Sequence, residues 1–203
     1  MCYKNLPIVA QACPQCAQIL PNKIQSQHCG TCLSNPPPFD HAFTLFPYEE
    51  PIALLLMALK FSGALHHAQL FGELLTQKIR LSWYHQLALP DLIIPMPLHQ
   101  DRLKKRGFNQ ALEIARPVSK QLKIPLDLTG LIRHKATQPQ TFLKARARRA
   151  NVARAFLARS HYHNLTIAVL DDIITTTETL RACCRVLKLK GAKSIHVWSV
   201  ARR

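Results

Sequence analysis

The stretch Ile167-Ala-Val-Leu-Asp-Asp-Ile-Ile-Thr-Thr-Thr-Glu-Thr-Leu180 decides the fold of this chain. It begins with an apolar run without polar alternation, which is typical of a strand buried on both faces of a parallel sheet. Two carboxylates follow, Asp171 and Asp172, and then a hydroxyl-rich turn leads into a segment with helical spacing. In open α/β sheets, ligands bind beyond the carboxyl ends of the strands, where the next helix begins. The stretch therefore predicts an α/β fold, a parallel sheet flanked by helices, with a ligand site at this point.

The polar residues of the same stretch suit a ribose phosphate. A helix N-terminus presents unpaired N–H groups and a partial positive charge, and both favour a phosphate group. Asp171 and Asp172 can accept hydrogen bonds from two neighbouring sugar hydroxyls. The residues expected around the phosphate are Thr175, Thr176, Thr177, Glu178 and Thr179. The alternative is that these acids and threonines only cap a buried strand and helix.

Near the N-terminus, Cys13-Pro-Gln-Cys16 and Cys29-Gly-Thr-Cys32 form two pairs separated by twelve residues. Each pair can place two thiolates on one tetrahedral ion, and the intervening segment is long enough to bring the pairs together. Four cysteine ligands leave no open coordination position, so we expect a structural zinc ion in a zinc ribbon. The alternative is two disulfides or unliganded thiols, which the spacing and a reducing compartment disfavour. We expect the ribbon to span residues 1–40, closed by Pro36-Pro-Pro38, and a second domain to span residues 41–203.

The composition is strongly basic. Among 203 residues, 27 lysines and arginines stand against 11 acids, and the formal net charge is +16. Such an excess is typical of proteins that bind nucleic acid or an acidic membrane surface; alternatively, it only keeps the protein soluble. Residues 1–20 lack the pattern of a signal peptide, and the longest aliphatic run, 52–59, is too short to cross a bilayer. We therefore expect a cytoplasmic protein without a transmembrane segment.

A second buried strand is predicted at Asp91-Leu-Ile-Ile-Pro-Met-Pro97, and a basic turn follows it. Arg102, Lys104, Lys105 and Arg106 precede Gly107, which permits a tight turn. A strand that runs into a basic turn and then a helix is typical of an anion site. We expect Arg102 and Arg106 to bind pyrophosphate, together with Lys60 at the end of a predicted helix. The alternative is that all three cations are solvated helix residues.

A cationic stretch without a single acid runs from residue 128 to residue 170. Alanine-rich spacing over 143–157 predicts a helix whose cations can neutralise the phosphates of a nucleic acid. The candidate nucleic-acid-binding residues are Lys144, Arg146, Arg148, Arg149 and Arg154. The alternative is an ordinary charged surface helix. At the C-terminus, Arg202 and Arg203 read as a basic tail after a last strand.

Residues 171–179 resemble the phosphoribosyl-pyrophosphate loop of type I phosphoribosyltransferases, in which two acids and two apolar residues precede Thr-Thr-Gly-x-Thr. Thr177 stands at the family's glycine, and Glu178 replaces the small residue after it. Both changes affect ligand affinity more than the fold. The resemblance implies that phosphoribosyl pyrophosphate, accompanied by magnesium, is a ligand. It also implies that the cationic stretch corresponds to a mobile loop that covers the pyrophosphate in many members.

The segment Pro95-Met-Pro-Leu-His99, with the following Arg102-Leu-Lys-Lys-Arg106-Gly-Phe-Asn-Gln110, resembles the hallmark of the ComF (ComFC) competence family. That family joins a four-cysteine zinc ribbon to a phosphoribosyltransferase-like domain. The likeness continues through Lys60, Gly63, Thr137, Gln140, Leu143, Arg149, Asn151, Phe156 and Gly191-Ala192. It implies a role in natural transformation, with single-stranded DNA and DNA-uptake proteins as partners and peripheral contact with the inner membrane.

Two functions are therefore weighed. The first is a competence protein that handles single-stranded DNA and binds phosphoribosyl pyrophosphate. The second is an active phosphoribosyltransferase that uses a nucleobase or nucleic-acid-related acceptor. In the second, Asp171 and Asp172 would hold the ribose hydroxyls and offset the positive charge of an oxocarbenium-like state. No Walker loop occurs, so the chain is not by itself an ATP-driven motor.

Overall fold

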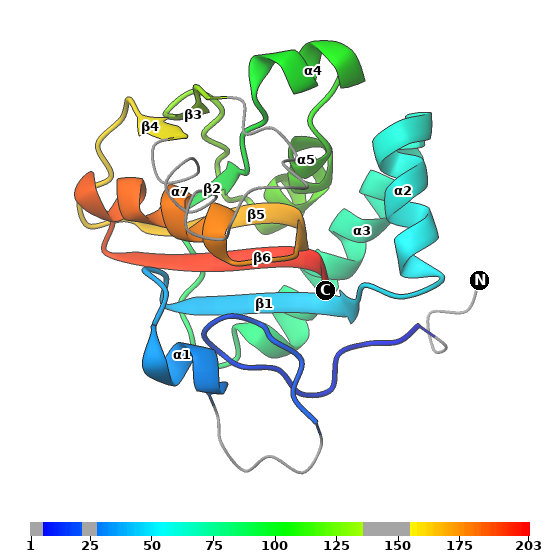
Figure 1. Ribbon diagram of the computed structural model, residues 1–203, viewed down its shortest axis with the longest axis horizontal. Coiled ribbons are helices and arrows are strands. Elements are labelled where there is room, and N and C mark those ends of the chain that lie inside the picture. The colour runs from blue at the N-terminus through cyan, green and yellow to red at the C-terminus, as the bar shows by residue number, and fades with distance from the viewer. Residues whose placement is uncertain (1–5, 22–27, 136–154) are drawn as a thin grey trace, which may run out of the picture.

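Four parallel strands form the sheet at the centre of the protein. The computed structural model describes residues 6–21, 28–135 and 155–203, and Figure 1 shows its elements along the chain. The strands lie side by side in the order β1-β6-β5-β2, and each neighbouring pair is parallel. They are β1 (His41–Pro47), β2 (Leu92–Pro95), β5 (Thr166–Ile174) and β6 (Ser194–Arg202). A separate antiparallel pair consists of β3 (Leu131–Arg133) and β4 (Phe156–Ala158).

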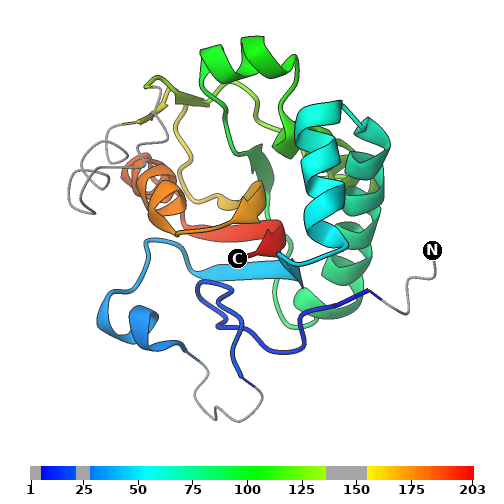
Figure 2. The ribbon, with the colours of Figure 1, turned by 45° about the vertical axis from the view of Figure 1, so that its right-hand side comes forward.

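Helices cover both faces of this sheet. The helices that the structure describes are α1 (Gly30–Ser34), α2 (Ile52–Ser62), α3 (Leu65–Lys78) with a π-helical turn (Ile79–Trp83), α4 (Gln100–Arg106), α5 (Gln110–Leu122) and α7 (Glu178–Leu189). Helices α3 and α5 pack together on one face, with α2 beside α3, and α7 packs on the other face (Figure 2). The predicted α/β fold, a parallel sheet flanked by helices, is confirmed.

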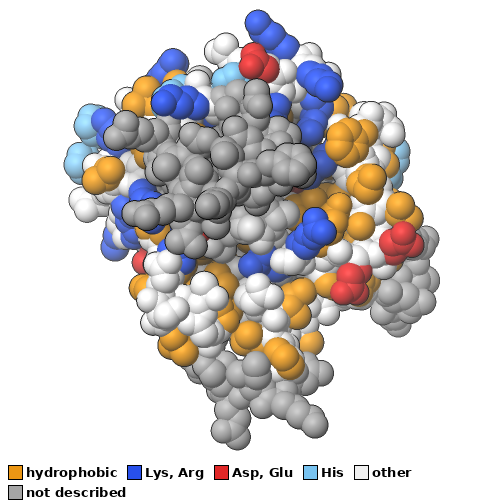
Figure 3. All heavy atoms as spheres, in the orientation of Figure 1, with side chains coloured by type: hydrophobic (Ala, Val, Ile, Leu, Met, Phe, Trp, Pro, Cys, Tyr) orange, Lys and Arg blue, Asp and Glu red, His pale blue; other side chains and the backbone are white. Residues whose placement is uncertain are grey.

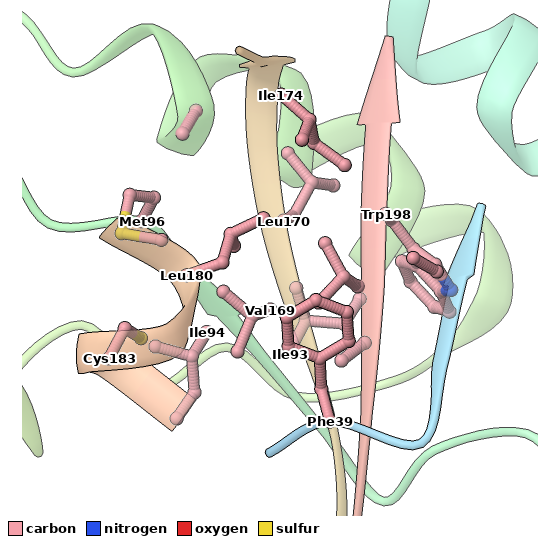
Figure 4. Packing of buried hydrophobic residues seen from close by; sticks show 14 of the residues in the cluster. Phe39, Ile93, Ile94, Met96, Val169, Leu170, Ile174, Leu180, Cys183 and Trp198 are labelled. Carbon is pink, nitrogen blue, oxygen red and sulfur yellow. The ribbon is translucent and has the colours of Figure 1, made fainter. Parts of the chain in front are cut away.

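The core lies on both faces of the central strands β5 and β6. Apart from Ile173, which is partly buried, their apolar side chains are almost completely buried, as the unbroken hydrophobic runs predict. Figure 4 shows Ile94, Leu180 and Cys183 together where α7 packs against the sheet. Each fully buried side chain of this size contributes about 1.5–3 kcal/mol relative to an exposed one. The site at the sheet edge is therefore held by a rigid framework.

Three local expectations are corrected by the structure. The basic segment 102–106 is a helix, α4, because His99 accepts a hydrogen bond from the Asp101 N–H and because cations suit a helix C-terminus. Gly107 ends this helix with φ +82°, the left-handed conformation that glycine adopts freely. The helix predicted over 143–157 does not reach residue 157, because Phe156–Ala158 pairs with β3. The expected basic tail is also wrong for Arg202, which lies buried in β6.

The buried imidazole of His196, in β6, predicts an acid-sensitive fold. Trp198 Nε1 donates to the Tyr84 hydroxyl at 2.9 Å, and that hydroxyl lies 2.6 Å from His196 Nδ1. Burial, and then the neighbouring His41, lower the pKa of His196 from 6.5 to about 4. On acidification, His196 in the unfolded chain takes up a proton at a higher pH than His196 in the folded protein. The free energy of unfolding is therefore highest above pH 6.5 and falls as the pH drops from about 6.5 towards 4. The expected loss is about 3 kcal/mol.

Urea unfolding at several pH values in this window measures the effect. The variant His196→Phe should lose less stability than the natural protein on acidification, whatever its stability at neutral pH. The variant His85→Gln, at an exposed position, should keep the natural pH dependence. An unchanged pH dependence in His196→Phe would show that other groups cause the acid sensitivity.

Candidate ribose-phosphate site and metal centre

The candidate site is a cleft at the carboxyl edge of the sheet, between β2 and β5. The chain leaves β2 for α5 on one face of the sheet and leaves β5 for α7 on the other, so the two strands flank the point where ligands bind in open α/β sheets. The cleft has a volume of about 190 Å³. Its polar lining consists of Lys60, Arg102, Arg106, Asn109, Gln110, Arg133, Asp171, Asp172, Thr175, Thr176 and Thr179.

Eight of the predicted site residues therefore meet in one cleft, although they come from α2, α4, β5, the loop after β5 and the start of α7. Thr177 and Glu178 do not belong to the described lining. Asn109, Gln110 and Arg133 also line the cleft but were not predicted from the sequence as site residues. Asn109 and Gln110 stand in the quoted ComF-like motif, which was a signal for them, whereas Arg133 reaches the cleft only through the β3–β4 pairing.

An ion pair between Lys60 and Asp172 closes the base of the cleft. Lys60 Nζ lies 2.7 Å from Asp172 Oδ2, and the Asp172 side chain is 6% exposed. The other oxygen, Oδ1, accepts the Ile173 N–H at 3.0 Å. Both acids lie within β5, which continues to Ile174, whereas the sequence predicted them at the end of the strand. Asp172 is thus fixed in position while its oxygens keep further lone pairs for a ligand hydroxyl.

Asp171 lies beside this ion pair, and its surroundings disfavour its charged form. Desolvation, and then the neighbouring Asp172 carboxylate, raise the pKa of Asp171 well above its ordinary value. Its Oδ1 accepts the Asp172 N–H at 2.9 Å. A carboxyl group that keeps its proton can donate a hydrogen bond, whereas a carboxylate only accepts. The arrangement suits the neighbouring hydroxyls of a ribose.

Three arginines provide the positive wall of the cleft. Arg102 and Arg106 come from α4, and Arg133 from β3. Arg106 Nη1 donates to Gln110 Oε1 at 2.5 Å, and its guanidinium carbon lies 5.8 Å from the centre of the Phe61 ring. Figure 3 shows Lys and Arg side chains gathered over the part of the molecule that carries α4. Planar guanidinium groups in this number suit a pyrophosphate.

The loop after β5 is held in shape by two buried arginines. Arg202 Nη1 donates to the carbonyl of Ile174 at 3.1 Å and also to that of Thr175. Arg181 Nε donates to Thr177 Oγ1 at 3.2 Å. Thr177 has φ −74° and stands at the N-cap of α7, so this conformation does not require glycine. A threonine therefore fits the backbone at the position of the family's glycine, and its hydroxyl helps to fix the loop.

The four N-terminal cysteines form a cluster that can hold a metal ion. Their Sγ atoms all lie within 4.8 Å of one another, and those of Cys16 and Cys29 are 3.5 Å apart. Four convergent sulfur atoms are the donor set of a closed tetrahedral zinc site. Burial raises the pKa of Cys16 to about 11. The thiolate form therefore requires a cation beside it, and metal binding must displace protons.

Comparison with known proteins identifies the family. DNA utilization protein YhgH of Escherichia coli O157:H7 is 36% identical over 191 residues, which cover 94% of this chain and 83% of that protein. Competence protein F of Haemophilus influenzae is 34% identical, with 94% and 84% of the two chains covered. The chain belongs to the ComF competence family. The sequence model of the phosphoribosyl transferase domain matches residues 109–203 of this ComF protein.

Among solved structures, the ComF chain is similar to adenine phosphoribosyltransferase from Leishmania tarentolae. The two share 11% identity with a TM-score of 0.46, and the match covers 80% of this chain and 91% of that one. The predicted ComF family is confirmed by the relatives at 34–36% identity. The candidate nucleic-acid-binding residues Lys144, Arg146, Arg148, Arg149 and Arg154 lie outside the described residues. Within the described part of the chain, no helix has the length and apolar character needed to span a membrane.

In this ComF protein two arginines, Arg181 and Arg202, connect the cysteine-rich segment to the loop of the cleft. Arg202, which donates to carbonyls of the loop after β5, also donates from Nη2 to Gln18 Oε1 at 2.9 Å. Arg181, which binds Thr177, also donates from Nη1 to the Pro36 carbonyl at 3.1 Å. Gln18 lies two residues after Cys16, and Pro36 lies four after Cys32. The cysteine-rich segment therefore braces both ends of the loop.

Proposed function

We propose that this ComF protein handles incoming single-stranded DNA in natural transformation and binds phosphoribosyl pyrophosphate in the cleft between β2 and β5. The observation that carries the proposal is the cleft itself, where the paired acids Asp171 and Asp172 stand between a cationic wall and a helix N-terminus. Its relatives bear the names DNA utilization protein and Competence protein F. A net charge of +16 fits a polyanionic partner.

Each part of phosphoribosyl pyrophosphate has a matching group in the cleft. Asp171 and Asp172 would take the two ribose hydroxyls, because they offer adjacent carboxyl oxygens. The 5′-phosphate would lie against the start of α7, among the hydroxyls of Thr175, Thr176 and Thr179. The pyrophosphate would lie against the cations of α4 and Lys60. Thr177 supports this loop from outside the cleft, and Glu178 has no contact role in the proposal.

Two metal ions belong to the proposal. Zinc would occupy the cysteine cluster as a structural ion, since Cys13, Cys16, Cys29 and Cys32 supply all four donors. Magnesium would accompany phosphoribosyl pyrophosphate, bound mainly by the substrate's own oxygens, with the carboxylates of the cleft as suitable hard ligands. Magnesium supplies neutralisation of the pyrophosphate charge. The residues of the chain position the ribose and the leaving oxygens.

The expected setting is the cytoplasm. DNA-uptake proteins at the inner membrane would pass single-stranded DNA to the ComF protein, and contact with that membrane would be peripheral. The candidate DNA-binding cations are those of the acid-free stretch, Lys144, Arg146, Arg148, Arg149 and Arg154. Flexible strands with exposed phosphates match such a run of cations.

The alternative is that the same cleft transfers the phosphoribosyl group to a nucleobase or a nucleic-acid-related acceptor. The two acids favour this alternative, because they would offset the positive charge that develops as the bond to pyrophosphate breaks. The acceptor's nucleophilic atom would form the new bond at the anomeric carbon, and pyrophosphate would leave. A coupled assay for pyrophosphate release, with nucleobases and oligonucleotides as acceptors, decides between the two functions.

Single-stranded DNA binding should depend steeply on salt. We expect fluorescence anisotropy of a labelled oligothymidylate to show log K falling linearly with log salt, by about 0.7 for each phosphate contacted. The variant with Arg146, Arg148 and Arg149 replaced by Ala should lower the magnitude of this slope by about 2, because three contacts of about 0.7 each are lost. Its affinity should fall at every salt concentration.

A charge-matched control separates local contacts from net charge. The variant with Lys120, Lys190 and Lys193 replaced by Ala removes three cations near the amino edge of the sheet, opposite the edge that carries the cleft. It should keep the natural slope. If both triple variants bind alike, the acid-free stretch is not the DNA-binding element. If the natural protein does not bind the oligonucleotide, the proposed function fails.

A further inference from the structure

A second groove adjoins the ribose-phosphate cleft on the side of β3. One wall comes from the segment after β2 and from the junction of α4 and α5, and the other from β3 with its flanking residues. Leu98, Asn109 and Arg133 line both the groove and the cleft. The two hollows therefore adjoin each other at these residues. Both α4 and β3 lie past the β2 side of the sheet, as Figures 1 and 2 show.

The groove has an apolar floor and a cationic rim. Phe108 contributes a half-buried ring, and Leu103 and Leu128 are 41% and 52% exposed. The charged lining residues are Arg116, Arg133, Arg159 and Glu113, which gives a net charge of +2 from three cations and one acid. Glu113 lies 3.4 Å from Arg116, which reduces its repulsion of an anion. His99 and His134 add two further rings to the lining.

We propose that this groove seats the bases of single-stranded DNA, with the sugar-phosphate backbone along its rim. This inference rests on the proposed function and names the surface that binds the single-stranded DNA. Proteins that bind single strands combine a positive groove with rings on which bases stack. Duplex DNA keeps its bases stacked inside and has no use for an apolar floor. A net charge of +2 in the groove and of +16 on the chain favours a polyanion over an apolar peptide.

The residues that the groove shares with the cleft give the strand a path. A strand lying on Phe108 and Leu128 would reach the ribose-phosphate cleft past Arg133, which lines both hollows. The guanidinium carbon of Arg133 lies 5.6 Å from the centre of the Phe156 ring. This contact fixes the position of Arg133 between the groove and the cleft. DNA in the groove would thus place one nucleotide beside the phosphoribosyl site.

Anisotropy of a labelled oligothymidylate tests the groove. Phe108→Ala should weaken binding by about 5- to 150-fold, the range for one base–aromatic stack, with no change in salt slope. Arg159→Ala should lower the magnitude of the slope by about 0.7. Because Phe108 is half-buried, the variant Leu128→Asp, at an exposed position, provides a second probe that places a negative charge in the groove; it should weaken binding at least tenfold. Leu81→Ala, at a 73% exposed leucine in a different hollow, is the control and should bind as the natural protein does.

Calorimetry with phosphoribosyl pyrophosphate and magnesium completes the test. The groove variants should keep natural affinity for this ligand. DNA binding that survives both Phe108→Ala and Leu128→Asp would overturn the groove while leaving the proposed function intact. Loss of phosphoribosyl-pyrophosphate binding in folded groove variants would assign the groove to that ligand and also overturn the inference. A natural protein that binds no single-stranded DNA would refute the groove and the proposed function together.

Discussion

Replacing Cys32 by Ser is expected to release the metal from the cysteine cluster and to lower Tm by about 10–20 °C. The cluster holds the segments that carry Gln18 and Pro36, which receive hydrogen bonds from the buried guanidinium groups of Arg202 and Arg181. A hydrogen bond to a charged group contributes about 1.5–3 kcal/mol, so losing one at each arginine costs about 3–6 kcal/mol. In a protein of this size, 1 kcal/mol corresponds to about 2–4 °C in Tm.

Metal analysis and thermal unfolding together measure this outcome. The natural protein should contain one zinc ion per chain, and Cys32→Ser should contain much less. Chelation of the natural protein should reproduce the lower Tm, and the effect should be easier to obtain at acid pH because protons compete for the thiolates. Cys183→Ala, at a buried cysteine of α7 outside the cluster, is the control and should keep its zinc. A zinc-free natural protein with unchanged Tm would contradict a structural metal.

The support that Arg181 and Arg202 provide was beyond the reach of the sequence. A cation in a helix and another next to the C-terminus normally read as solvated residues. Here both are buried, at 4% and 7% exposure, because carbonyl groups of the loop and polar groups of the cysteine-rich segment converge on them. Such convergence depends on tertiary contacts across more than a hundred residues. The same holds for the pairing of Lys60 with Asp172, which joins α2 to β5.

The sequence predicted correctly the features that depend only on residues close together in the chain. The apolar runs before Asp171 and before Met96 indicated buried parallel strands, because short unbroken runs of this kind are typical of strands covered on both faces. The cysteine spacing indicated the cluster. By contrast, α4 was missed because its cations resembled a solvated turn, and β4 was missed because alanine-rich composition favours a helix until β3 provides a partner.

Replacing Asp172 by Asn is expected to reduce affinity for phosphoribosyl pyrophosphate with magnesium by about 100-fold or more. The asparagine keeps the shape of the side chain and one carbonyl oxygen. It loses the charge that strengthens hydrogen bonds to ribose hydroxyls, and two charge-assisted bonds are worth about 3–6 kcal/mol in total. Lys60 also loses its ionic partner, 2.7 Å away, and would compete for the remaining oxygen. Isothermal titration calorimetry measures the affinity, and thermal unfolding reports how much of the change comes from lost stability.

The matched control is Asp91→Asn, which makes the same substitution at the opposite edge of the sheet. Asp91 Oδ2 accepts the Thr166 N–H at 2.8 Å, so the residue has a structural contact but no place in the cleft. This variant should bind phosphoribosyl pyrophosphate as the natural protein does. If Asp172→Asn binds within twofold of the natural protein, the carboxylates do not hold the ribose. The ion pair with Lys60 would then be a purely structural feature of β5, and the cationic wall alone would account for any binding of pyrophosphate.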